Sequence, residues 1–405
     1  MKHIAFLTLS MSRGGAERVI ASMCNEYLVD RYRITIITCM KRPLEYDLDS
    51  RIQVKTLDDA ETEAKQNMAV RFLRRRTKLS KILGEITPDI LLCFLPEPNM
   101  IACSLKLSKG FRNSLRFPVI ISVRNDPVRE YKSKVRHLMM TTLYPKADGY
   151  VFQTDDAKRY FDFSTHIKET ATVIPNPLSR NFITGDKATE RDKRVVSVGS
   201  LSRQKNQRFL IEAFAQVHKD FPDYTLEIFG EGSLREELQT LIHDKNLDNV
   251  VTLKGSVPNV KDQIRTASIF VMTSDYEGMP NALMEAMAIG LPVISTDCPC
   301  GGPKFLIEDG VNGKLVPTMQ NEYVCNDCGK GEKHINKEVQ ENIENQQDDL
   351  NHLNREVSTL VDAMEQLIKD RKLAESMATE AMKVRQKLHP DIINQEWERY
   401  INIFC

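Results

Sequence analysis

The 405-residue sequence lacks the features that mark secreted and membrane-spanning proteins. Its nine cysteines are too few for a disulfide framework in a chain of this length, so we expect a reducing compartment. The longest apolar runs, Ile90–Leu95 and Val119–Val123, fall far below the ~20 residues that a membrane-spanning helix needs. The apolar stretch at the start is short and Arg13 interrupts it, which argues against a signal peptide. These absences predict a cytoplasmic globular protein.

Net charge is absent as well, because 56 Lys and Arg balance 56 Asp and Glu. The balance hides an asymmetry: residues 1–180 hold 30 Lys and Arg against 20 Asp and Glu, so the excess of acidic residues lies in 181–405. A neutral chain with one basic and one acidic half does not fit a nucleic-acid binder. The basic half suits an anionic surface or ligand, or it serves solubility alone, and charge does not decide between these two interpretations.

What the sequence does contain is a regular alternation of strand and helix patterns. In the first half the strand patterns cover Ile4–Leu9, Ile34–Cys39, Ile90–Leu95, Val119–Val123 and Gly149–Phe152. The helical patterns between them cover Ala16–Leu28, Met68–Ile86, Asn99–Leu107 and Arg129–Leu143. Because parallel strands need helical crossovers, this alternation predicts a parallel sheet with helices on both faces.

The pattern breaks at prolines and charged residues, which predicts a linker at 181–193. A second alternation follows, with strands at Val195–Val198, Tyr224–Phe229, Val250–Leu253, Ile269–Thr273 and Pro292–Ser295, and helices at Gln207–His218, Ser233–Asp244, Val260–Ala267 and Asn281–Ile289. We therefore predict an α/β protein with two doubly wound, Rossmann-like domains, 1–180 and 194–390, facing a central cleft. A polar insertion at 318–355 and a last helix at 391–405, packing back towards the first domain, complete the expected organisation.

Both domains open with a loop that suits an anion. Gly14 and Gly15 stand between a strand and a helix, where a ligand phosphate approaches the N–H groups of the helix start. The pattern is neither G-x-G-x-x-G nor G-x-x-x-x-G-K-[ST], and a Gly-Gly pair alone is more often a plain turn. In the second domain, Gly199 is followed by Arg203 and Lys205, whose cations suit a diphosphate, although such loop charges are commonly only solvated.

The most specific motif is EGMPNALME, which contains Glu277 and Glu285. Glu277 lies in a strand-to-helix loop, and Glu285 lies about two helical turns further on. Carboxylates in these places accept hydrogen bonds from sugar hydroxyls, while loop N–H groups donate to phosphate. Exposure or a local ion pair is the plainer interpretation of Glu285, but the apolar neighbours of this residue favour burial.

These motifs resemble those of the family-4 retaining glycosyltransferases of the GT-B fold. The motifs in order are GGAER at 14–18, VGSLSRQKN at 198–206, FGEG at 229–232, LKGSV at 253–257, EGMPNALME at 277–285, GLPVIST at 290–296 and DGVNGKLVP at 309–317. The resemblance covers nearly the whole chain outside 318–355. It implies transfer of a hexose or N-acetylhexosamine from a nucleotide sugar, with UDP expected, to a glycan or polyprenyl-diphosphate-linked acceptor in cell-surface polysaccharide synthesis.

The resemblance also implies the site residues. Glu277 and Lys205 have the catalytic roles: Glu277 contacts the transferred sugar and Lys205 holds the diphosphate. Glu285 binds the ribose of the nucleotide. The implied donor-binding set is Gly14, Gly15, Ser200, Arg203, Lys205, Val257, Glu277, Gly278, Met279, Pro280, Asn281, Ala282, Leu283 and Glu285. The resemblance further implies that the configuration at the anomeric carbon is retained through front-face attack, while the leaving diphosphate is stabilised electrostatically. It implies neither a cofactor nor a metal ion.

Two positions depart from the pattern of many members. Ser200 stands where an arginine is common, and Arg203 is a candidate to replace its charge. After the strand at Val119–Val123, Arg124-Asn125-Asp126 stands where a histidine is common. Arg124 and Asp126 are therefore the acceptor-side candidates, and either Asp126 or a backbone carbonyl would take over the polar contact.

Some features stay open. Cys325 and Cys328 with His334 make up fewer than the four ligands of a structural zinc site, so we expect no metal. The helix at 68–86 carries Arg71, Arg74, Arg75, Arg76, Lys78 and Lys81, which suits either peripheral contact with an anionic inner membrane leaflet or a solvated face. A sugar-nucleotide epimerase or hydrolase of the same fold, or a non-catalytic nucleotide-sugar-binding protein, remains the alternative function.

Overall fold

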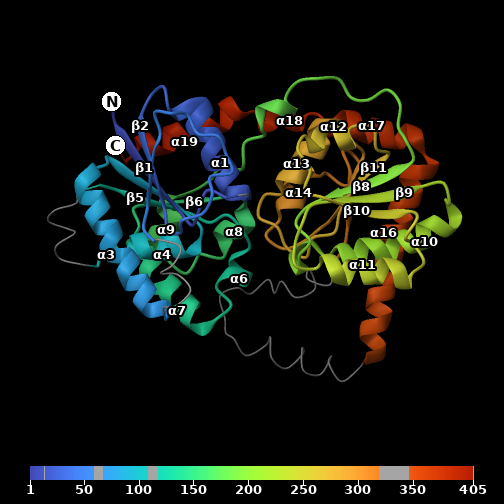
Figure 1. Ribbon diagram of the computed structural model, residues 1–405, viewed down its shortest axis with the longest axis horizontal. Coiled ribbons are helices and arrows are strands. Elements are labelled where there is room, and N and C mark those ends of the chain that lie inside the picture. The colour runs from blue at the N-terminus through green and yellow to red at the C-terminus, as the bar shows by residue number, and fades with distance from the viewer. Residues whose placement is uncertain (13, 59–66, 108–116, 319–345, 405) are drawn as a thin grey trace. The chain divides into compact units, whose positions relative to one another are not determined.

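The computed structural model describes residues 1–405 except 13, 59–66, 108–116, 319–345 and 405. The chain divides into two compact units (Figure 1). Unit 1 comprises Met1–Pro177 and Pro390–Cys405, and unit 2 comprises Leu178–His389. Each unit contains one sheet with helices packed on it, and the strand pairs within each sheet are parallel. The predicted fold class, α/β with two parallel-sheet domains, is confirmed.

The sheet of unit 1 has the strand order β3-β2-β1-β4-β5-β6-β7. Its strands are β1 His3–Thr8, β2 Arg33–Thr38, β3 Gln53–Thr56, β4 Ile90–Phe94, β5 Val119–Ser122, β6 Gly149–Phe152 and β7 Ala171–Val173. Its helices are α1 Gly15–Met23, α3 Met68–Ile86, α4 Pro96–Leu105, α6 Pro127–Glu130, α7 Lys134–Leu143, α8 Asp155–Arg159, α9 Thr165–Thr170 and α19 Pro390–Asn402. The central strands β1 and β4 are buried along their whole length, as expected for a sheet covered on both faces.

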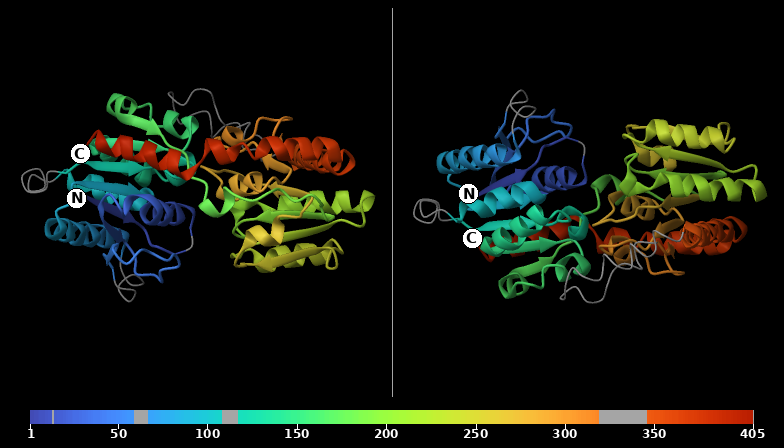
Figure 2. Two further views of the ribbon diagram at one scale, coloured as in Figure 1. Left: turned by 90° about the horizontal axis from the view of Figure 1, so that it is seen from above. Right: turned by 90° about the horizontal axis from the view of Figure 1, so that it is seen from below.

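Helices α3, α4 and α7 cover one face of this sheet, and α1 and α19 cover the other (Figures 1 and 2). Helix α19 belongs to unit 1 although it ends the chain. Its Trp397 stacks on Phe94 of β4 with the ring centroids 5.7 Å apart. The backbone N–H of Tyr150 in β6 donates to the hydroxyl of Tyr400 at 2.7 Å. The last helix therefore completes the core of the first domain.

The sheet of unit 2 has the order β10-β9-β8-β11-β12-β13. Its strands are β8 Arg194–Val198, β9 Thr225–Phe229, β10 Val251–Gly255, β11 Ile269–Met272, β12 Val293–Thr296 and β13 Lys314–Val316. Its helices are α10 Gln207–Asp220, α11 Arg235–Asp244, α12 Val260–Ile264, α13 Asn281–Ala288, α14 Gly302–Leu306, α16 Gln346–Lys369, α17 Arg371–Ala381 and α18 Val384–Lys387. Short 3₁₀ turns lie at Arg180–Phe182 and Arg203–Lys205. The last ten residues of the expected insertion thus begin helix α16, and 319–345 lie outside the described residues.

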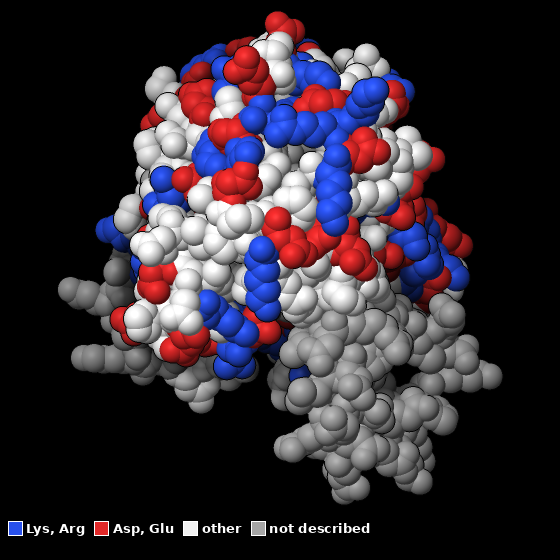
Figure 3. Space-filling view, turned by 90° about the vertical axis from the view of Figure 1, so that its right-hand side faces the viewer, with Lys and Arg blue, Asp and Glu red and all other residues white. Residues whose placement is uncertain are grey.

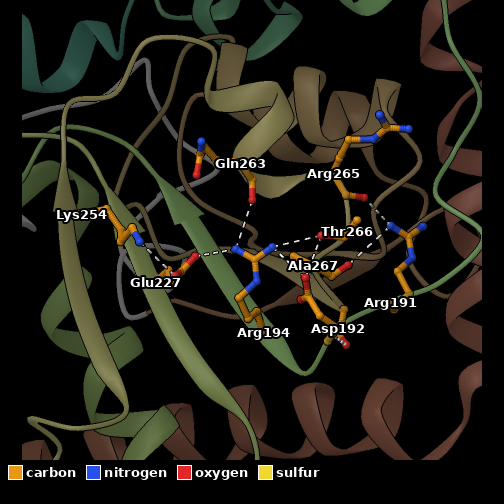
Figure 4. Close-up of polar contacts among 10 residues, drawn as sticks. Arg191, Asp192, Arg194, Glu227, Lys254, Gln263, Arg265, Thr266 and Ala267 are labelled. Carbon is orange, nitrogen blue, oxygen red and sulfur yellow. Dashed lines mark hydrogen bonds and ion pairs between the residues drawn. The ribbon is translucent and has the colours of Figure 1, made fainter.

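The residues expected to form a linker are built into unit 2. Figure 4 shows Arg194, the first residue of β8, donating to Glu227 at 2.6 Å and to Asp192 at 2.8 Å. Arg191 donates to the carbonyl of Arg265 at 3.0 Å. The boundary between the units therefore falls after Pro177, earlier than the sequence pattern indicates. Charged residues mark this segment because they form ion pairs at the amino end of β8.

Other differences from the sequence pattern have local causes. Strands β3, β7 and β13 were not predicted, because none is longer than four residues and each is only partly buried. The helix expected at Arg129–Leu143 is split into α6 and α7. Asp126 caps α6 by accepting from Val128 N at 3.0 Å, and Ser133 starts α7 by accepting from Arg136 N at 3.2 Å. Each cap begins a separate helix.

Candidate active site

The loops after β8, β11 and β12 meet at the carboxyl edge of the sheet in unit 2. Thr273, directly after β11, donates from its hydroxyl to the carbonyls of Lys205 and Asn206, at 3.1 and 3.0 Å. The side chain of Asn206 donates to Asp275 at 2.9 Å, and Asp275 N donates to the carbonyl of Gln204 at 2.8 Å. These bonds hold the loop of Lys205 against the loop that leads to Glu277. Ligands of open α/β sheets bind at this edge.

Glu277 is the centre of this arrangement. The residue is only 5% exposed, and the hydroxyl of Ser274 donates to its Oε1 at 2.7 Å. Lys205 Nζ forms an ion pair with the same oxygen. Ser274 is held in turn by Thr296, whose hydroxyl donates to the Ser274 carbonyl at 2.6 Å. The sequence placed Glu277 and Lys205 at one site, and the structure joins their side chains directly.

The rest of the motif forms the start of α13. Pro280 precedes the helix and provides no side-chain cap, so the first turn presents its N–H groups at the positive end of the helix. Glu285, in the second turn, is buried at 6% exposure among apolar neighbours, as its sequence context indicates. Met279 and Leu283 are also buried. Gly278 to Leu283 therefore form one continuous turn from loop to helix beside Glu277.

The remaining candidates of unit 2 are more accessible. Ser200 and Arg203 are exposed on the loop after β8, and the hydroxyl of Ser200 lies 3.2 Å from that of Ser202. Val257, two residues after β10, is half-buried. Accessibility suits a role in ligand contact, but the side chains of these three described residues form no hydrogen bond or ion pair with those of Lys205 or Glu277.

The glycine loop of unit 1 has an anionic group already in place. Gly15 begins α1 and Gly14 is its extended N-cap residue. A Cβ added to Gly14 would lie 2.2 Å from Oε2 of Glu17, so only glycine allows this carboxylate to fold back onto the helix start. Burial raises the pKa of Glu17, and its bond to a backbone N–H opposes the rise. A phosphate would have to share this helix end with Glu17, which sequence reasoning did not anticipate.

Arg124 and Asp126 have different roles in the structure. Arg124 is 7% exposed, donates to Asn176 Oδ1 and to Ser122 Oγ, and lies 5.4 Å above the ring of Phe94. Burial lowers the pKa of Arg124 to about 9. Asp126 is buried as the cap of α6, and burial raises its pKa. No described carboxylate forms an ion pair with Arg124, so its charge is balanced only by dipoles and a ring face.

Glu130, at the end of α6, is a titratable residue that the sequence did not single out. The residue is half-buried, but its Oε2 atom is inaccessible and accepts no hydrogen bond among the described residues. Burial, and then the neighbouring carboxylate of Asp126, raise the pKa of Glu130 to about 8, and Arg136 opposes the rise. No motif signals this residue because its environment is made by α6 and its neighbours in space.

Glu130→Gln is therefore expected to make unit 1 less sensitive to pH. In the unfolded chain this carboxyl ionises near pH 4.5, but in the folded protein it stays protonated to about pH 8. The free energy of unfolding must consequently fall as pH rises through that window. Between pH 5 and 8 we expect the free energy of unfolding of the wild type to fall by on the order of 2 kcal/mol relative to that of Glu130→Gln.

Urea unfolding at both pH values measures this difference. The only tryptophan, Trp397, lies in unit 1 and reports on that unit through its fluorescence. Glu169→Gln, at an exposed glutamate of the same unit, is the matched control and should leave the pH dependence unchanged. If the free energy of unfolding changed equally with pH in the wild type and in Glu130→Gln, the prediction would be contradicted.

The structure gives no support for a metal site among the residues it describes. No group of three or more His, Cys, Asp and Glu side chains in the described part of the chain is arranged to hold a metal ion. Cys325, Cys328 and His334 lie outside the described residues. Cys298 and Cys300 are both buried, and burial together with the carboxylate of Glu277 raises the pKa of the Cys298 thiol. These cysteines shape the loop next to Glu277.

The helix expected to present a basic face turns most of its arginines inward. Arg75 is buried and donates to both Asp58 and Glu97 at 2.6 Å. Arg74 also donates to Asp58, and Arg71 lies 4.0 Å from Glu97. Lys78 and Lys81 remain exposed. Within the described ranges, no helix has both the length and the apolar character needed to cross a bilayer.

Two comparisons with known proteins identify the family of this chain. A family model described as glycosyl transferases group 1 matches residues 180–324. An uncharacterized glycosyltransferase of Methanocaldococcus jannaschii is 30% identical to the chain over 292 residues, which cover 64% of this chain and 71% of the relative. The chain belongs to the group 1 glycosyltransferases. The resemblance to glycosyltransferases seen in the sequence is thereby confirmed.

Two further comparisons extend over more of this glycosyltransferase. An alpha-1,4-N-acetyl-D-galactosaminyltransferase of Campylobacter jejuni, whose name specifies a PP-undecaprenol-linked glycan, is 27% identical over 319 residues, or 78% of this chain and 85% of the relative. The crystal structure of HepE from Anabaena with UDP and glucose superimposes with a TM-score of 0.74 at 18% identity, covering 99% of this chain and 100% of that one. This likeness shows a shared GT-B fold.

Proposed function

We propose that this glycosyltransferase moves a hexose or N-acetylhexosamine from a UDP-sugar to a glycan or lipid-linked glycan acceptor, with retention of the anomeric configuration and without a metal ion. The observation that carries the proposal is the pairing of Lys205 with Glu277 at the carboxyl edge of unit 2. A cation and a buried carboxylate side by side suit the two parts of a nucleotide sugar, because the cation attracts the diphosphate and the carboxylate accepts from sugar hydroxyls.

In the proposed reaction, negative charge develops on the leaving diphosphate. The ammonium of Lys205 and the N–H groups at the start of α13 would stabilise this charge, with Arg203 as a further cation of the same loop. Glu277 would hold the transferred sugar, since Ser274 and Lys205 fix its carboxylate rather than leave it free to attack. Glu285 would bind the ribose, and the segment around Val257 would contact the base.

The choice of donor and acceptor draws on the relatives. HepE was crystallised with UDP and glucose, and the Campylobacter jejuni relative is named for a PP-undecaprenol-linked glycan. A lipid-linked acceptor would place this enzyme at the inner face of the plasma membrane as a peripheral protein. The excess of basic residues in 1–180 is consistent with such an acceptor, because both its diphosphate and the surrounding lipid surface carry negative charge.

A panel of UDP-, GDP- and ADP-sugars, titrated calorimetrically, tests the donor. We expect one UDP-sugar to bind, with affinity reduced at least tenfold in Glu285→Ala and in Lys205→Ala. Arg208→Ala, an exposed arginine on α10, is the control that should bind like the wild type. No binding of any donor to the folded protein would refute the proposal.

Product analysis then separates the functions. Transfer to a lipid-linked glycan, unaffected by EDTA and giving the donor's anomeric configuration in the NMR spectrum, is the expected result. Conversion of the donor at full rate without acceptor would indicate an epimerase or hydrolase instead. Donor binding with no turnover on any acceptor would indicate a binding protein.

A further inference from the structure

Residues 128–138 of unit 1, which we call the 128–138 segment, carry a group of exposed apolar and basic side chains. The segment runs from the middle of α6 into the first half of α7 (Figure 1). Three of its large apolar side chains are mostly exposed: Val128 at 57%, Val135 at 58% and Leu138 at 68%. Of the whole helix α7, only Met140 and Leu143 are buried. Tyr131 anchors the segment in the core at 1% exposure, whereas Val128, Val135 and Leu138 lie outside the core.

The same segment carries a concentration of positive charge. Lys132, Lys134 and Arg136 are exposed, and none of them forms an ion pair with another residue in the described parts of the chain. By contrast, the face drawn in Figure 3 carries both basic and acidic side chains, interspersed with one another. The one acidic residue of the segment, Glu130, has an inaccessible carboxylate oxygen. The exposed charges of the segment are thus all of one sign.

The position of two of these cations is unfavourable for the isolated protein. Lys134 and Arg136 lie in the first turn of α7, which contains no acidic residue. A helix N-terminus carries partial positive charge, so cations there destabilise the helix and anions stabilise it. An external anionic partner would relieve this repulsion. Together with the exposed apolar side chains, this favours a partner that is both anionic and apolar.

We propose that the 128–138 segment docks on an anionic lipid surface. Phospholipid headgroups would meet Lys132, Lys134 and Arg136, while Val135 and Leu138 would enter the boundary between headgroups and acyl chains. A nucleic acid would satisfy the cations but leave the apolar side chains in water. The segment follows the loop of Arg124 and Asp126, so docking brings the carboxyl edge of the unit 1 sheet to the membrane. The inference rests on the proposed function only in that a lipid-linked acceptor resides there.

Cosedimentation of the full chain with vesicles tests the proposal without donor or acceptor. One vesicle type contains phosphatidylglycerol mixed with phosphatidylcholine, and the other contains phosphatidylcholine alone. We expect binding to the mixed vesicles only, weakened by 0.5 M salt. Because each cation near an anionic bilayer contributes about fivefold to binding, Lys132→Glu with Lys134→Glu should weaken it at least about 25-fold. Val135→Ser with Leu138→Ser should weaken it about tenfold.

One double variant controls for net charge, and a second tests another group of exposed lysines. Lys219→Glu with Lys245→Glu places the same charge change on exposed lysines of unit 2 and should leave vesicle binding within twofold. Lys78→Glu with Lys81→Glu tests the exposed lysines of α3. Tryptophan fluorescence of Trp397 and titration with UDP-sugar confirm that each variant is folded and that donor binding is retained.

Several outcomes would overturn the proposal. One is equal binding of the wild type to both vesicle types. Another is loss of vesicle binding in the α3 variant but not in the 128–138 variants. The third is that the 128–138 variants lose a concentration-dependent self-association of the wild type and keep vesicle binding. A protein that transfers sugar to its acceptor yet does not bind vesicles would refute only the docking surface. A protein that binds vesicles through this segment but binds no donor would refute only the proposed function.

Discussion

Glu277→Gln is expected to slow sugar transfer severely while strengthening the binding of free UDP. The ammonium of Lys205 is paired with the Glu277 carboxylate, so this carboxylate would compete with the diphosphate for the same cation. Glutamine has nearly the same shape and keeps an oxygen to accept from Ser274, so the loop should keep its conformation. Without the competing charge, UDP affinity should rise about threefold to tenfold, since such pairs contribute about 1 kcal/mol.

Transfer should fall about 100- to 1000-fold in the same variant, because a neutral amide positions the sugar less well and stabilises less charge in the transition state. Calorimetric titration with UDP and initial rates with the full donor give the two quantities. Lys205→Met provides the comparison, since it should lose both UDP affinity and transfer. If Glu277→Gln weakened UDP binding as much as Lys205→Met does, Glu277 would contribute to UDP binding rather than compete with the diphosphate for Lys205.

Gly302→Ala is expected to damage the same site from a distance in sequence. Gly302 begins α14, and a Cβ there would lie 1.9 Å from the carbonyl oxygen of Gly278 and 2.9 Å from Cδ of Pro280. Both atoms belong to the turn between Glu277 and α13, so the added methyl group must push this turn away. Overpacking of this kind destabilises by about 2 kcal/mol. A misplacement of about 1 Å at a reacting centre costs about 100-fold in rate.

Urea unfolding, UDP-sugar titration and initial rates measure these effects in Gly302→Ala. The control is Gly84→Ala, the same substitution at an exposed glycine of α3 where the new methyl group meets nothing within 4 Å. It should stabilise unit 1 by about 1 kcal/mol, because alanine is the better helix former, and leave the rate unchanged. Wild-type rates in Gly302→Ala would show that the turn tolerates displacement.

Local signals in the sequence were sufficient for the fold class and for part of the site. Buried parallel strands such as β1 and β4 are continuous apolar runs, so their positions follow from composition alone. The motif of Glu277 and Glu285 is likewise local, and the glycosyltransferase resemblance that it carries is confirmed by the comparisons. The loops that bring Lys205 to Glu277 are separated by about seventy residues, and their pairing follows from strand order, because β8 and β11 are neighbours.

The tertiary structure decided what depends on burial and on distant partners. The arginines of α3 looked like a basic surface, but Asp58 and Glu97 draw Arg75 inside, and no spacing rule anticipates these partners. Helix α19 is the last helix of the chain, yet it completes the core of unit 1, because its Trp397 stacks on Phe94 of β4. The sequence by itself determined most of the strands and helices and the candidate residues Lys205 and Glu277, because these depend on local patterns. Charge balance, protonation and exposure at Glu17, Glu130 and the 128–138 segment were set by the packing of elements that are far apart in the chain.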